Sequence, residues 1–174
     1  MYKPNKKYKQ TRCCISNEES IRYISMEQAR KHYKDIPFWE NSARLKLLTH
    51  FRSLVKTYFE NSILNMISGI YNEKPEATDA KKAINLILKN AYAIISHADI
   101  KTYTASTPSV SIRGSGKNMN LILNIFNLAS NNIEPDIAIY YIDQAIAVYK
   151  SNRVASLLRV INPFFWMSVA LKYR

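Results

Sequence analysis

The chain has 174 residues, a formal net charge of +12 and 47% hydrophobic residues. That hydrophobic share excludes an intrinsically disordered chain, and the length fits one domain of ordinary size. Only three glycines occur, so few turns can use a positive φ angle, which argues against a protein rich in β-hairpins.

The first 15 residues are polar and aperiodic, and they contain five basic residues and no acidic one. We interpret residues 1–15 as a flexible basic arm and residues 16–174 as a helical domain. A basic arm favours contact with polyanions, which include nucleic acid, anionic lipid and acidic protein surfaces. The basic residues of the arm are Lys3, Lys6, Lys7, Lys9 and Arg12.

The two cysteines are adjacent, at Cys13 and Cys14, and adjacent cysteines rarely bridge each other because the disulfide is strained. No disulfide framework is therefore predicted, and we expect a reducing, cytoplasmic location. The N-terminus also lacks the apolar segment of a secretory signal. A palmitoyl chain on these cysteines is an alternative route to a membrane.

Apolar residues recur at steps of three and four along the next segments, which is typical of amphipathic helices. A helix is expected over 16–33, because Ser16 and Glu19 can form a capping box. The stripe of a long second helix extends to Ile70, and a third helix covers about 78–96. The core is expected to include Leu48, Val55, Ile84, Ile87, Ile142 and Ile146.

Residues 99–117 break this periodicity and contain Pro108 and two of the three glycines. We expect either a long loop there or a short β excursion through 109–112. A fourth helix is expected over about 118–131, and Pro135 is placed to open a fifth. The fold class predicted is all-α, a single bundle-like domain of five or six helices with a long loop near 99–117.

The end of that loop has the composition of an anion-binding turn. Backbone N–H groups of Gly-rich loops that open a helix can cradle phosphate, and a lysine can neutralise its charge. The match to a nucleotide-binding phosphate loop fails, because Ser111 stands where the earlier glycine belongs and Asn118 where the Mg²⁺-binding hydroxyl belongs. The residues of the simpler anion nest are Gly114, Ser115, Gly116 and Lys117.

No complete catalytic constellation is present in the sequence. His32, His50 and His97 lie far apart, without the close spacing of metal ligands. We therefore expect no metal, no cofactor and no enzymatic activity, and we keep an anion-dependent enzyme using the 114–117 loop as an alternative.

The most hydrophobic stretch lies in an amphipathic, aromatic and basic segment, 152–174, which we expect to be offset at Pro163. Its apolar part covers 12 residues, from 160 to 171, and a membrane-spanning helix needs about 20. Three roles remain open for its aromatic residues: completing the core, lying in a membrane interface or docking a protein partner. The residues assigned to membrane or partner contact are Arg159, Phe164, Phe165, Trp166, Lys172 and Arg174.

Together these features predict a non-enzymatic helical adaptor that binds an anionic surface, most simply the cytoplasmic face of a membrane. The expected partners are an anionic membrane or an acidic protein. Binding of single-stranded nucleic acid is the alternative, in which the basic residues track phosphates and tyrosines stack on bases. We further expect Trp166 at the surface beside a phenylalanine, in an apolar patch rimmed by Arg159 and Lys172.

Overall fold

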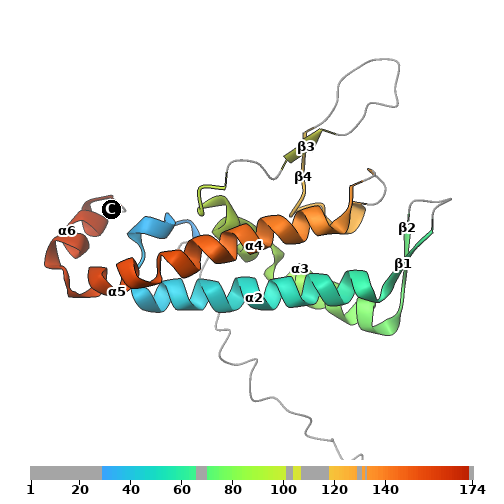
Figure 1. Ribbon diagram of the computed structural model, residues 1–174, viewed down its shortest axis with the longest axis horizontal. Helices are drawn as coiled ribbons and strands as arrows, with labels where there is room; N and C mark the ends of the chain where they lie inside the picture. The colour runs from blue at the N-terminus through green and yellow to red at the C-terminus, as the bar shows by residue number, and fades with distance from the viewer. Residues whose placement is uncertain are drawn as a thin grey trace, which may run out of the picture.

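A computed structural model describes residues 29–65, 70–100, 104–106, 118–128, 131 and 133–172. Helices dominate the described residues, and the three longest of them lie side by side along the molecule (Figure 1). The helices are η1 (Tyr33–Asp35), α2 (Phe38–Glu60), α3 (Pro75–Ser96), η2 (Ile125–Asn127), α4 (Pro135–Ser151), α5 (Arg153–Ile161) and α6 (Pro163–Lys172). The strands are β1 (Ser62–Asn65), β2 (Ile70–Glu73), β3 (Thr104–Ser106) and β4 (Asn118–Asn120).

The core lies where α2 packs between α3 and α4. One side of α2 is fully buried, and short residues of the other two helices, such as Ala80, Ala91 and Ala145, allow their backbones to approach it. The prediction of buried stripes is confirmed for Leu48, Val55, Ile84, Ile142 and Ile146. Ile87 is only partly buried, because it packs at the edge of the cluster.

The expectation that the second helix extends to Ile70 is wrong. It ends at Glu60, and β1 pairs antiparallel with β2 in the register Ser62 to Glu73. Asn61 and Ser62 stop the helix because their side chains donate to the carbonyls of Thr57 and Tyr58, at 3.0 and 2.6 Å. Such local bonds satisfy carbonyls that a further helical turn would otherwise use.

The hairpin is fixed to the helices by one acidic side chain. Glu73 accepts a hydrogen bond from the Tyr58 hydroxyl at 3.1 Å and from Lys81 Nζ at 2.5 Å. Burial, followed by the charge of Glu73, raises the pKa of Tyr58, so that its hydroxyl stays a donor. After the hairpin, α3 begins with Pro75 at its first position, three residues earlier than the sequence pattern indicates, since Pro needs no N–H partner there.

The helix expected over 118–131 is also absent from the described part of that range. Asn118–Asn120 instead forms β4, which pairs with β3, and a 3-10 turn follows at η2. Asn120 explains the change, since its side-chain oxygen accepts from the N–H groups of Ile122 and Leu123 at 3.0 and 3.1 Å. The apolar residues Leu121, Ile122, Ile125 and Leu128 are nevertheless buried, so the segment contributes to the core as a turn.

The last three helices form a path that bends. Pro135 opens α4 as the sequence predicts, and Asp143 on this helix accepts two hydrogen bonds from Arg52 on α2, at 2.5 and 2.9 Å. A single residue, Asn152, separates α4 from α5. The axis of α6 is bent by 101° from that of the helical segment 135–161. This bend places α6 beside η1 and the start of α2 (Figure 1).

Candidate functional site

The sharp turn between α5 and α6, which we call the elbow, forms for local reasons. Pro163 has no backbone N–H and stands at the first position of α6, where no partner is needed. Asn162 caps the new helix, because its side chain accepts from the N–H of Phe164 at 3.0 Å and its carbonyl from that of Phe165 at 3.2 Å. The predicted offset at Pro163 is thus confirmed.

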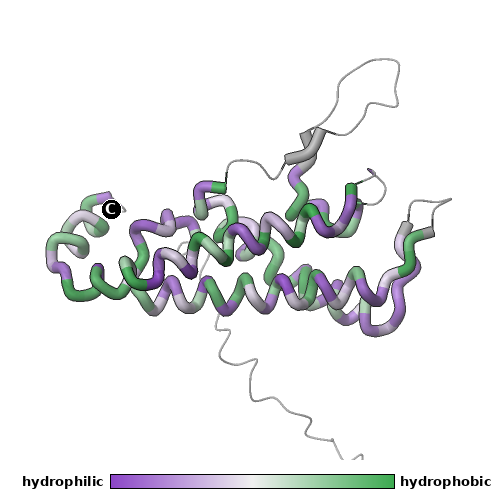
Figure 2. Tube along the Cα trace, viewed as in Figure 1, coloured by the Kyte–Doolittle hydropathy of each residue, from purple (hydrophilic) through white to green (hydrophobic). Residues whose placement is uncertain are grey.

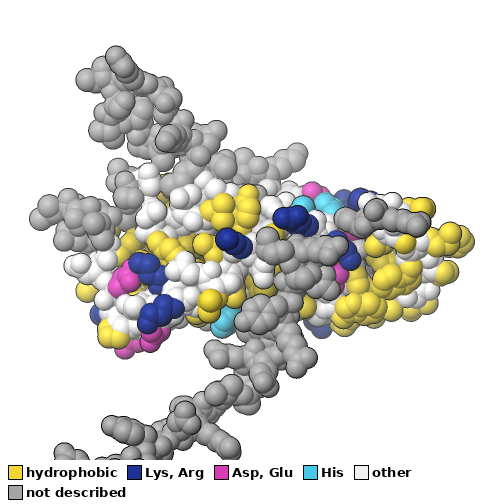
Figure 3. Space-filling view, turned by 180° about the vertical axis from the view of Figure 1, so that it is seen from behind, with side chains coloured by type: hydrophobic (Ala, Val, Ile, Leu, Met, Phe, Trp, Pro, Cys, Tyr) yellow, Lys and Arg dark blue, Asp and Glu magenta, His cyan; other side chains and the backbone are white. Residues whose placement is uncertain are grey.

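Both arms of the elbow expose large apolar side chains. Figure 2 shows how much of α6 is hydrophobic, and Figure 3 shows hydrophobic side chains gathered at the end of the molecule that α5 and α6 form. Exposure is highest at Leu171, Ile161 and Phe164, at 78, 77 and 76%. We call this the elbow surface, and its residues are Val154, Leu157, Leu158, Ile161, Phe164, Trp166, Met167 and Leu171.

Trp166 holds α6 in place while it remains at the surface. Its ring stacks on Trp39 of α2, with centroids 5.8 Å apart and planes at 16°, and 39% of the residue stays exposed. Phe165 meets the same ring edge-on at 5.4 Å, and the indole N–H donates to the Val160 carbonyl at 3.3 Å. The structure therefore places Trp166 at the surface beside a phenylalanine, as the sequence predicts.

The basic residues of this region do not form the simple rim that the sequence suggests. Arg159 donates to the side-chain oxygen of Asn152 at 3.0 Å and to the Tyr33 carbonyl at 3.5 Å. Burial lowers the pKa of Arg159, and the charge of Asp35 partly opposes this effect. Lys172 forms an ion pair with Asp35. Both cations thus face the protein, because polar groups around η1 lie within their reach.

A buried polar network fixes the start of α5. Asn41 of α2 donates to the Tyr149 carbonyl at 3.0 Å, and Asn152 donates to the Tyr33 carbonyl at 2.7 Å. Arg44 is fully buried and donates to the Tyr149 hydroxyl at 2.9 Å and to Glu40 at 3.0 Å. A buried hydrogen-bonded network of this kind holds its members in one geometry, and so it sets the direction in which α5 leaves the core.

This network is visible in the sequence once the register of α2 is known. Asn41 and Arg44 precede Leu48 and Phe51 at steps of three and four, so they occupy positions of the buried stripe. Polar residues at stripe positions indicate buried hydrogen bonds rather than a solvent-facing side. Asn41 and Arg44 are absent from the candidate site residues predicted above, because apolar periodicity alone does not reveal polar residues in a buried stripe.

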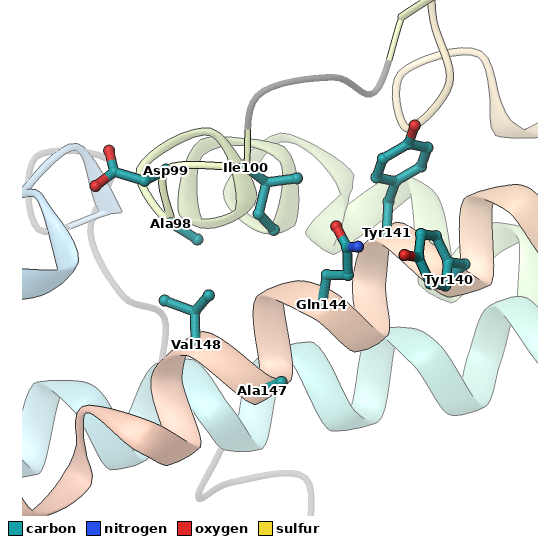
Figure 4. Close-up of a pocket in the computed structure, with 8 residues that line it drawn as sticks. All are labelled: Ala98, Asp99, Ile100, Tyr140, Tyr141, Gln144, Ala147 and Val148. Carbon is teal, nitrogen blue, oxygen red and sulfur yellow. The ribbon is translucent and has the colours of Figure 1, made fainter.

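A hollow lies between α4 and the turn that follows α3, with a volume of about 560 Å³. Tyr140, Tyr141 and Gln144 face it from α4, while the carboxylate of Asp99 points away from the tyrosines (Figure 4). That carboxylate instead bonds His32 at 2.9 Å. Among the described residues that line this hollow, no nucleophile lies next to a base.

Several predicted site residues lie outside the described residues: the basic arm 1–15 with its cysteines, the anion nest 114–117, and Arg174. Among the described residues, no group of three His, Cys, Asp or Glu side chains is placed to hold a metal ion.

No single helix of the described ranges is long and apolar enough to cross a membrane; only the bent pair formed by 135–161 and α6 has the length and composition. Comparisons of the chain with protein-family models, with curated proteins and with solved structures gave no match.

Proposed function

We propose that this protein is a non-enzymatic helical adaptor that docks on the anionic, cytoplasmic face of a membrane through the elbow surface and its basic termini. The observation that carries the proposal is the elbow surface itself, with four exposed large apolar side chains on α5 and four on α6. The proposal includes the finer architecture expected from the sequence, a single bundle-like domain of five or six helices.

The chemistry of the elbow surface favours lipid over water. Apolar and aromatic side chains on one side of a surface helix enter the boundary between headgroups and acyl chains, and tryptophan is preferred at that depth. Residues 144–174 contain no Asp or Glu, so no carboxylate of this segment is repelled by anionic headgroups. Each Lys or Arg near such a membrane adds about 1 kcal/mol of attraction.

Vesicle co-sedimentation tests the proposal with matched variants. The full chain is mixed with phosphatidylcholine vesicles, with or without phosphatidylserine. Replacing Phe164 and Leu171 together by Ser should lower the partition coefficient on anionic vesicles at least about tenfold, because full burial of one such side chain contributes about 1.5–3 kcal/mol. The control replaces Leu86 and Tyr140 by Ser, two residues that are exposed on α3 and α4, and should bind like the wild type.

Two results would contradict the proposal. Equal binding of both double variants would show that the elbow surface does not contact lipid, and equal binding to neutral and anionic vesicles would remove the role of charge. Circular dichroism of each variant confirms that the helices are retained. Since Phe164 and Leu171 project into solvent, their replacement should leave the thermal unfolding midpoint nearly unchanged.

The rival functions rest on other parts of the chain. Binding of single-stranded nucleic acid depends on the basic arm, and an anion-dependent enzyme would use the 114–117 loop; both segments lie outside the described residues. A single-stranded oligonucleotide added to the vesicle assay tests the nucleic-acid alternative. If the oligonucleotide displaces the protein from the vesicles, the basic arm, and not the elbow surface, dominates binding.

A further inference from the structure

Two contacts hold α6 folded back over the start of α2. The first is the stack of Trp166 on Trp39. The second is the ion pair between Lys172, at the last position of α6, and Asp35 in η1. In Figure 1 the C-terminal end of α6 lies close to the segment that contains η1, which these contacts explain. Both contacts join residues more than 120 positions apart in the sequence.

Asp35 lies near two of the cations assigned to lipid contact. It pairs directly with Lys172, and its charge acts on Arg159, whose guanidinium also reaches the Tyr33 carbonyl at 3.5 Å. A carboxylate and a lipid phosphate use the same chemistry to bind Lys and Arg, since both are oxyanions that accept charge-assisted hydrogen bonds. The two ligands therefore compete for one set of cations.

We propose that Asp35 is an internal competitor of lipid phosphate, which holds Lys172 and α6 in a closed position until an anionic membrane displaces it. The inference rests on the proposed membrane function and adds its regulation. When the pair opens, Lys172 turns to the headgroups, the tryptophan stack separates, and α6 presents Trp166 to the bilayer together with the apolar residues that are already exposed.

The contacts that hold α6 in the closed position are weak enough for an anionic membrane to displace them. The side chains of Lys172 and Asp35 are 57% and 21% exposed, and exposed ion pairs contribute little because water and salt screen them. The tryptophan stack also stays partly open to solvent, with Trp39 at 56%. A membrane offers many phosphates at once, whereas Asp35 offers a single carboxylate.

The test compares two neutralised acids. Asp35→Asn removes the ion pair with Lys172, and the control Asp79→Asn changes the net charge equally by removing the pair with Lys82, at 3.2 Å on α3. On anionic vesicles, Asp35→Asn should bind about two- to fivefold more tightly than Asp79→Asn, the range that an exposed pair supports. The variant Asp35→Glu keeps the carboxylate and should return binding to the wild-type level.

An optical signal follows the closed position without lipid. The chain contains two tryptophans, and they are the two that stack, so the exciton couplet of the pair in circular dichroism reports this contact. In the absence of vesicles, Asp35→Asn should weaken the couplet while Asp79→Asn leaves it intact. Anionic vesicles should weaken it in the wild type, and Trp39→Phe gives the baseline without a couplet.

The outcomes separate this inference from the function on which it rests. Equal binding and equal couplets for Asp35→Asn and Asp79→Asn, with the wild type bound to anionic vesicles, overturn the competition and leave the membrane function standing. No binding by either the wild type or Asp35→Asn overturns the membrane function and the competition with it. Tighter binding together with a weaker couplet for Asp35→Asn alone supports the competition.

Discussion

Tyr149→Phe removes one oxygen atom from the centre of the buried network and leaves the packing volume almost unchanged. That hydroxyl accepts from Arg44 Nη1 at 2.9 Å and donates to the Ile94 carbonyl at 2.9 Å. Ile94 is among the last four residues of α3, whose carbonyls lack partners within the helix. The Tyr149 hydroxyl therefore binds both the buried guanidinium of Arg44 and a carbonyl at the C-terminal end of α3.

The magnitude follows from these two bonds. A hydrogen bond to a charged group contributes about 1.5–3 kcal/mol, and a buried acceptor left without a partner costs about 1–3 kcal/mol. The two effects overlap, so we expect Tyr149→Phe to lower the free energy of unfolding by about 2–4 kcal/mol. For a chain of this size, each kcal/mol shifts the unfolding midpoint by about 2–4 °C, so a fall of roughly 4–16 °C is expected.

Urea unfolding followed by circular dichroism measures this change, with Tyr140→Phe as the matched control. Tyr140 lies on the same helix but is 58% exposed, so removal of its hydroxyl should change the free energy of unfolding by less than about 0.5 kcal/mol. If Tyr149→Phe were as mild as its control, the hydroxyl would not hold Arg44 and α3 in the way described, and the network would not fix the start of α5.

Two further predictions concern pH and the core. Burial lowers the pKa of His97 in the folded protein, and the charges of Arg44, His32 and Arg30 lower it further. Below about pH 6.5 the unfolded chain therefore binds more protons than the folded protein. The free energy of unfolding should then fall as the pH drops through that value. Urea midpoints at two pH values should show this slope in the wild type, and His97→Gln should reduce it. Leu48→Ala should lower the free energy of unfolding by about 2–5 kcal/mol, since Leu48 is fully buried; a loss under about 1 kcal/mol in the same urea assay would contradict the packing described.

The sequence pattern predicts the long helices well because packing and periodicity agree there. Leu48 and Val55 on α2, and Ile142 on α4, recur at helical spacing and are all buried. Pro135 and Pro163 mark helix starts for a reason that needs no tertiary information, since proline is best placed at the first helical position. The break at Asn162 is also a local effect of Pro163, because the residue before a proline is disfavoured in the helical region.

The pattern fails where polar side chains bond to nearby backbone. Asn61 and Ser62 end α2, and Asn120 turns 121–124 away from a helix, although the apolar spacing continues through both segments. Apolar periodicity alone cannot separate a helix from a turn that buries the same residues. The inward direction of Arg159 and Lys172 is a tertiary property, because their partners Tyr33 and Asp35 lie far away in the sequence.

The buried network also constrains the order in which the chain can fold during synthesis. Its bonds join Asn41 to Tyr149 and Tyr33 to Asn152, separations of 108 and 119 residues, whereas α2 and α3 are neighbours linked by a hairpin. On the ribosome, α2 and α3 can pair while α4 is still being synthesised. The hydrogen bond from Arg44 to the Tyr149 hydroxyl cannot form until α4 is complete. Such long-range contacts close late because their loop entropy is large. During that interval the side of α2 that later packs against α4 is exposed to solvent. The apolar residues on this side of α2 could then be bound by a chaperone or by a second nascent chain.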